Sequence, residues 1–174
     1  MAKVSFTKLG LSKNQDIKVI EFNGQSIEIK QYLPVNDKLQ LISEVINASA
    51  DDNNFANPVK VSIFTTLMIL ENYTNINFTD KQKEDPAKLY DLVISGGLVK
   101  EVVNAIPEEE YNEIICGITD SIEAVYKYRN SILGILDTIS ADYNALDLDA
   151  TNIQKKLADP ENMALLKQVL TKLG

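Results

Sequence analysis

The clearest alternation of apolar and polar positions lies near the start of the chain, where two short runs flank Asn23-Gly24. Asn-Gly is typical of a type I′ turn, because that turn needs positive φ at both central residues, so the stretch predicts a β-hairpin. The pairs expected across it are Phe22–Gln25, Ile20–Ile27 and Lys18–Ile29. One face is then apolar, with four members: Ile20, Phe22, Ile27 and Ile29. Because a lone hairpin is marginal in water, we expect this face to pack on helices and the strand edges to remain free for another chain.

Helical spacing of apolar residues follows the hairpin. Asn36 is expected to cap a first helix. Asn57-Pro58 is expected to start a second, which is apolar on most sides and is therefore predicted to be the buried central helix. Further start and stop signals are Thr79 with Gln82, Asp85-Pro86 and Gly96-Gly97.

One long helix is predicted near 107–143, because apolar residues recur every seven positions from Tyr111 and from Ile115. It would be roughly 55 Å long at 1.5 Å per residue, so we expect part of it to project or to pack on another subunit. Gly117 and Gly134 weaken the helix and are places where it bends.

Arg129 stands at a core-type position of that helix and has two explanations. It either reaches the surface or pairs with an acid such as Asp142 or Glu123, or it is a polar group that fixes register and partner choice at an interface. A partner-binding surface is predicted at seven residues: Ile20, Phe22, Ile27, Ile29, Arg129, Ile132 and Leu136.

The fold class is therefore mainly α with a small N-terminal β-hairpin (α+β), a helical bundle containing one long helix. The organisation predicted is a hairpin unit at 1–33 and a helical domain at 34–174. The tail from Leu148 to the last residue predicts two short helices, the second starting at Asp159-Pro160.

Composition narrows the function. The net charge of −8 repels phosphate backbones, so we expect no direct nucleic-acid partner. Histidine, the commonest general base and zinc ligand, does not occur, and Cys116 is the single cysteine. The three acids Glu108–Glu110 are explained by the positive end of a helix dipole. We expect no signal peptide and no membrane span, and we predict a non-enzyme without catalytic, cofactor or metal residues and without a small-molecule substrate.

The layout "KVIEFNGQSIEIKQYLPVNDKLQLISEVI" followed by an acidic helical remainder resembles morphogenesis proteins of long-tailed bacteriophages and prophages, above all the tail assembly chaperones. The resemblance implies an oligomeric protein that binds the tape-measure and tail-tube proteins in the host cytoplasm before they polymerise. Two alternatives remain. One is a virion structural protein at the head–tail neck or connector, and the other is a small enzyme or ligand-binding module from outside phage biology.

Overall fold

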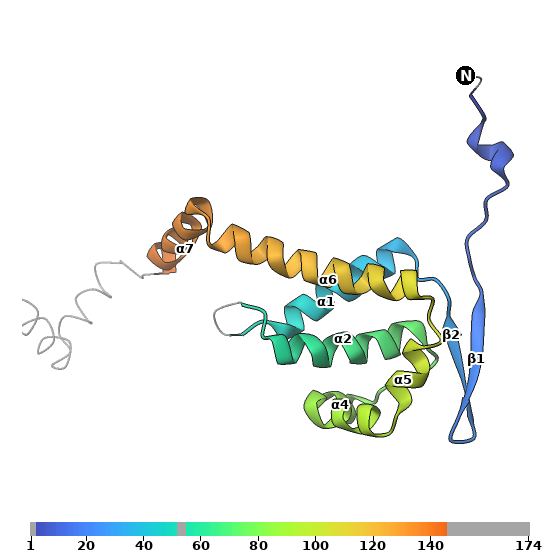
Figure 1. Ribbon diagram of the computed structural model, residues 1–174. Helices are drawn as coiled ribbons and strands as arrows, with labels where there is room; N and C mark the ends of the chain where they lie inside the picture. Colours follow the sequence, from blue (N-terminus) through green and yellow to red (C-terminus); the bar gives the residue numbers. More distant parts are fainter. Residues whose placement is uncertain (1–2, 52–54, 146–174) are drawn as a thin grey trace, which may run out of the picture. The chain divides into compact units, whose positions relative to one another are not determined.

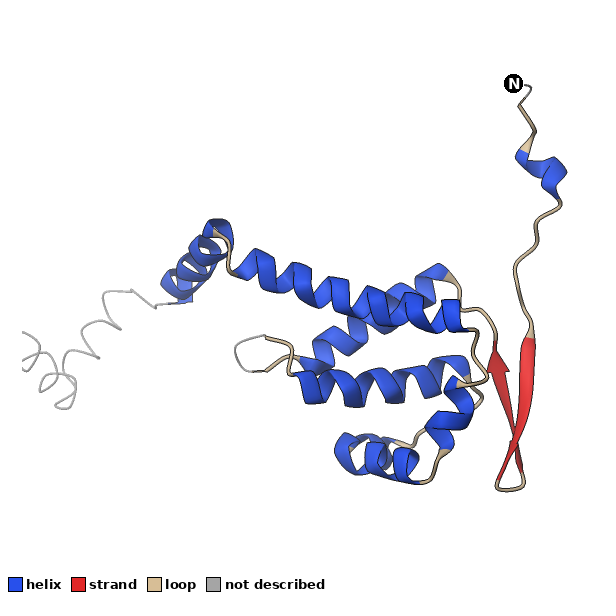
Figure 2. Ribbon diagram, viewed as in Figure 1, coloured by secondary structure: helices blue, strands red, loops and turns tan. Residues whose placement is uncertain are grey.

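A computed structural model describes residues 3–51 and 55–145, the last four of these by their backbone alone (Figure 1). The predicted tail helices lie outside the described residues. The described part is mainly helical, with one two-stranded antiparallel sheet (Figure 2), as the sequence predicts. A short 3₁₀ turn, Phe6–Leu9, precedes the sheet.

The hairpin consists of β1, Ile17–Phe22, and β2, Gln25–Lys30, and its register is the predicted one. Asn23 and Gly24 have φ values of +50° and +75°, as a type I′ turn requires. Both positions are left-handed, which explains why Asn followed by Gly occupies them.

Three of the predicted helix starts are confirmed. Asn57 accepts hydrogen bonds from the first-turn amides of α2, Pro58–Tyr73. Thr79 and Gln82 form a capping box on α3, Asp80–Lys83. The Asp85 side chain accepts from the Lys88 amide at the start of α4, Pro86–Ser95.

The first helix begins earlier than predicted. Helix α1 spans Val35–Ser49 with Pro34 at its N-cap, so Asn36 is not the cap. The reason is that Pro34 has extended backbone angles just before the first helical turn, and its carbonyl already accepts from the Lys38 amide. At the other expected break, Gly97 adopts a φ of +79° between α4 and α5, Leu98–Val103.

Helix α2 is central, as predicted, and packs against α1, α4 and α5. Its fully buried Leu70 and Tyr73 join Leu41 and Val45 of α1 in the hydrophobic core. In Figure 1 the hairpin stands across one end of these helices, with β2 nearer to them than β1.

The predicted long helix is two helices, α6, Glu108–Arg129, and α7, Ile132–Ala145. The Ser131 hydroxyl starts α7: it accepts from the Gly134 amide at 3.1 Å and donates to the Tyr128 carbonyl at 2.6 Å. A Cβ at Gly134 would collide with that same carbonyl, so glycine permits the turn to close. The seven-residue repeat of apolar residues therefore runs through the sequence of both helices, although the helix itself breaks between α6 and α7.

Gly117 does not interrupt α6. A Cβ built there would lie 2.6 Å from Cδ1 of Ile42, so a larger residue at this position would require the end of the Ile42 side chain to move. The chain divides into two compact units, Met1–Tyr126 and Lys127–Gly174. The hairpin, predicted as a unit of its own, lies in the first of these together with α1 to α5.

Candidate functional site

The apolar face of the hairpin packs on the helical core, as expected. Ile29 and Ile27 are buried, and Ile20 and Phe22 are half-buried against the same cluster. Because these four side chains are covered by the chain itself, the parts of the hairpin open to another protein are its outer face and the edge of β1.

The other predicted partner-binding residues belong to the second unit. Ile132 is 78% exposed and Leu136 is 55% exposed. They are part of a larger apolar surface on α7, which we call the α7 stripe. Its members are Ile132, Ile135, Leu136 and Ile139. The spacing i, i+3, i+4, i+7 places them on one side of the helix, and all four are exposed.

Arg129 is the last residue of α6 and is half-buried. The helix ends there, so Arg129 is not an interior position of a continuous apolar helix. Nearby, the Tyr128 hydroxyl donates to Asp137 across the turn between α6 and α7. The hydrogen bond to that carboxylate raises the pKa of Tyr128.

A buried ionic cluster, which the sequence did not reveal, joins α1, α2 and α6. Its centre is Glu110, 7% exposed. Glu110 Oε1 accepts from the Leu33 amide at 2.8 Å and from the Tyr73 hydroxyl at 2.9 Å. Glu110 Oε2 accepts from Lys38 Nζ at 2.8 Å. We refer to this as the Glu110 cluster, with four members: Lys38, Tyr73, Glu110 and Glu113.

Lys38 carries the charge that balances Glu110. Its Nζ also lies 2.5 Å from Glu113 Oε2 and 4.7 Å from the centre of the Tyr32 ring. Burial lowers the pKa of Lys38, but the hydrogen bonds and charges of Glu110 and Glu113 outweigh burial and raise it. Burial, followed by the bond to Glu110, raises the pKa of Tyr73. These groups are engaged with one another, so the arrangement ties helices together rather than presenting a reactive group.

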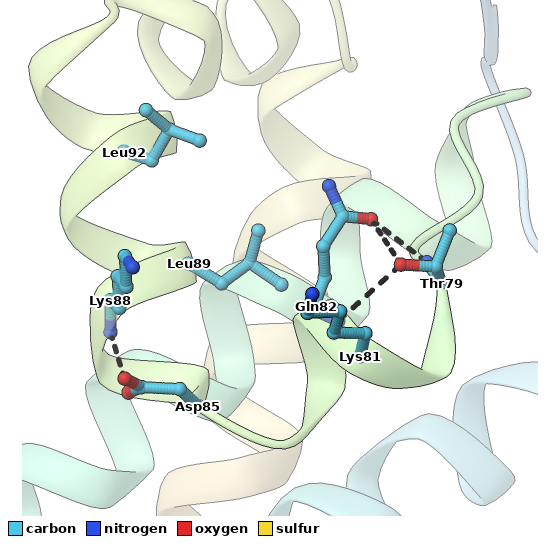
Figure 3. A pocket seen from close by; sticks show the side chains of 7 residues that line it. All are labelled: Thr79, Lys81, Gln82, Asp85, Lys88, Leu89 and Leu92. Carbon is cyan, nitrogen blue, oxygen red and sulfur yellow. Dashed lines mark hydrogen bonds between the residues drawn. The ribbon is translucent and has the colours of Figure 1, made fainter.

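The pocket drawn in Figure 3 is open and has a volume of about 380 Å³, with a mixed polar and apolar lining. Thr79 and Gln82 are hydrogen-bonded to each other, and Asp85 accepts from the Lys88 amide. The oxygens that line this pocket therefore cap α3 and α4, which explains their presence without a ligand.

Within residues 3–51 and 55–145, no group of three or more acidic or cysteine side chains is arranged to hold a metal ion. In the same ranges no helix combines the length and the apolar character that crossing a membrane would require. Comparison with family models, curated proteins and solved structures found no match.

Sequence reasoning assigned Glu110 to the helix dipole and overlooked the cluster. The signal for it was weak: Glu110 lies on the same side of α6 as the buried Ile114. Lys38 gave a similar signal, since it stands three residues before the buried Leu41. Neither spacing identifies the other residue as a partner.

Proposed function

We propose that this protein is a non-enzymatic phage morphogenesis protein, and specifically a tail assembly chaperone that binds tape-measure or tail-tube protein. The observation that carries the proposal is the α7 stripe. Apolar side chains exposed together along one side of a helix are typical of surfaces that bind another protein.

The geometry of the stripe favours a helical partner. Anchors at i, i+3, i+4 and i+7 are the pattern by which amphipathic helices bind one another or enter an apolar groove. Helix α7 contains acidic residues such as Asp137 and no basic ones. A partner helix with basic residues beside its apolar face would complement it, and the net charge of −8 acts in the same direction.

The phage assignment rests on the resemblance in layout, in which an Asn-Gly hairpin leads directly into a helical body. The polar groups of the Glu110 cluster and of the pocket in Figure 3 have structural partners, which favours a binding protein over an enzyme.

The direct test is a pull-down with purified tape-measure and tail-tube proteins of the phage or prophage that encodes this chain. We expect the wild-type protein to bind one of them and Leu136→Lys to bind about tenfold more weakly or worse, since a hot-spot side chain contributes that much. Leu39→Lys is the matched control, because Leu39 is equally apolar and is exposed on α1. Failure of the wild-type protein to bind either partner would overturn the proposal.

Quantitative mass spectrometry of purified particles against infected-cell lysate tests the role separately. A chaperone is abundant in lysate and absent from particles. Presence in particles at the copy number of a ring would replace this proposal with a structural role at the neck or connector.

A further inference from the structure

The outer edge of β1 is an unpaired strand edge. The Gln31 amide donates to the Asp16 carbonyl at 3.0 Å, which extends the hairpin register by one pair beyond Ile17–Lys30. Hydrogen-bonded pairs alternate with non-hydrogen-bonded pairs in an antiparallel ladder. Asp16 and Lys18 therefore use their backbone groups inside the hairpin, and the backbone groups of Ile17, Val19 and Glu21 point away from β2.

The opposite edge of the hairpin is covered by the protein's own chain. The Glu28 amide donates to Asn75 Oδ1 at 3.2 Å, and Ile29 forms an isolated antiparallel bridge with Thr74. Nothing comparable protects β1 within the described residues. Ile17 and Val19 are 55% and 56% exposed, and β1 has no proline or bulge that would prevent pairing.

We propose that β1 pairs antiparallel with β1 of a second copy of this chain, so that two hairpins form one four-stranded sheet. The two-fold axis passes beside Val19. Val19 then faces its counterpart, Ile17 faces Glu21 of the other copy, and Lys18 faces Ile20. Each outward amide and carbonyl between Ile17 and Glu21 gains a partner in this register.

The strand is complementary to itself in this arrangement. The apolar Val19 meets an apolar residue, and no two like charges stand directly opposite each other. A register centred on Glu21 would instead oppose two carboxylates. The contact uses the same surface on both copies, so assembly stops at a dimer. Both β1 edges are then paired, and neither can bind a further chain. The dimer stands independently of the phage assignment, because it depends on the hairpin alone.

Cysteine cross-linking tests the register. In the full-length chain with Cys116→Ser, Val19→Cys is expected to form a disulfide-linked dimer on mild oxidation, because hydrogen-bonded pairs have Cα atoms about 5.5 Å apart. Ile17→Cys is the matched control, with nearly the same exposure on the same face. Ile17→Cys should remain monomeric on a denaturing non-reducing gel. In the proposed register Ile17 faces Glu21 of the other copy, so the two cysteines are four positions apart along the strand. Cross-linking of neither variant, or of both to the same extent, would overturn the proposal.

Analytical ultracentrifugation of the uncross-linked protein tests the dimer itself. Val19→Lys places two lysines opposite each other in the dimer. It should raise the dissociation constant about fivefold, since like charges directly opposite destabilise a strand pair. Val35→Lys makes the same change at an exposed position of α1 and should leave the constant unchanged. A wild-type protein that is monomeric throughout the micromolar range, or equal weakening by both variants, would contradict the β1 interface.

Discussion

The Glu110 cluster and the α7 stripe both depart from the usual distribution of side chains, but in opposite directions. In the cluster, charged groups are buried, and Lys38 and Glu110 are nearly inaccessible. In the stripe, large apolar groups such as Ile132 are exposed. Burying charge costs free energy unless it is paired, and exposing apolar surface forgoes the hydrophobic contribution.

The two regions differ in where their partners come from. Every polar contact described for Glu110 is made within the first unit, by a backbone amide, a hydroxyl and an ammonium group. The α7 stripe has no comparable covering among the described residues. We infer that the cluster is completed by folding of one chain, whereas the stripe is completed by binding.

Glu110→Ala should have the largest effect on stability. It removes three hydrogen bonds and leaves Lys38 buried with Glu113 as its remaining carboxylate partner. Breaking a buried ion pair costs about 3–5 kcal/mol, and the surviving contact places this case near the lower end. The measurement is urea unfolding at pH 7, followed by circular dichroism.

Glu109→Ala is the control, because Glu109 occupies the same first turn of α6 but is exposed. It should change the free energy of unfolding by about 0.5 kcal/mol or less. Equal losses in the two variants would mean that the dipole of α6, and not the cluster, accounts for the effect.

Tyr73→Phe is expected to have the second largest effect. It removes the hydroxyl that donates to Glu110 Oε1 and keeps the ring in the core. A hydrogen bond to a charged group contributes about 1.5–3 kcal/mol. Tyr90→Phe is the comparison, since its hydroxyl lies 3.4 Å from Ser62 Oγ and makes a weak contact at most. If both substitutions lower the free energy of unfolding in urea by the same amount, the Glu110 cluster contributes less to stability than its burial indicates.

Alkaline pH should weaken the cluster without any substitution. The pKa values of Lys38 and Tyr73 are raised in the folded protein, so both hold their protons more tightly there than in the unfolded chain. Their contribution is complete below the unfolded pKa values of about 10 and is lost as pH rises through the folded values, at about 1.4 kcal/mol per pH unit for each proton.

The check is the free energy of unfolding measured in steps from about pH 8 to pH 12, a range that spans the unfolded pKa values. Tyr73→Phe should decline less steeply than the wild-type protein, because one of the two linked protons is gone. Parallel curves for the two proteins would show that Tyr73 does not titrate in this linkage.

The same contrast separates what the sequence could predict from what it could not. The Asn23-Gly24 turn and the caps at Asn57, Thr79 and Asp85 depend on residues close together in the chain, and each was correctly predicted. Local backbone preferences are sufficient for such features.

The contact between Lys38 and Glu110 joins residues 72 positions apart, and no local preference indicates which helices will meet. The break before α7 lies beside Gly134, where the sequence predicted a bend, but the seven-residue apolar repeat still led to one long helix rather than two. The predicted partner-binding residues stay a prediction, although the structure places Ile132 and Leu136 on the surface and the hairpin face in the core.

The smallest effect is expected for a substitution at Ser131. This substitution tests whether α7 is stabilised mainly by its N-cap rather than by packing against other parts of the protein. Ser131→Ala removes the hydroxyl that accepts from the Gly134 amide. Loss of an N-cap costs about 1 kcal/mol, so the Gly134 amide should exchange with solvent about fivefold faster by NMR. Ser140→Ala, an exposed change later in α7, should leave that rate unaltered.

Adding the proposed partner distinguishes the two ways of stabilising α7. If the stripe is completed by binding, a saturating tape-measure or tail-tube protein should slow exchange along α7 in the wild-type protein and recover most of the protection lost in Ser131→Ala. This follows because burial of the stripe stabilises every turn of the helix, whereas the cap acts on the first. Slow exchange throughout α7 in the isolated wild-type protein would show that the stripe is already covered, and the contrast with the Glu110 cluster would then disappear.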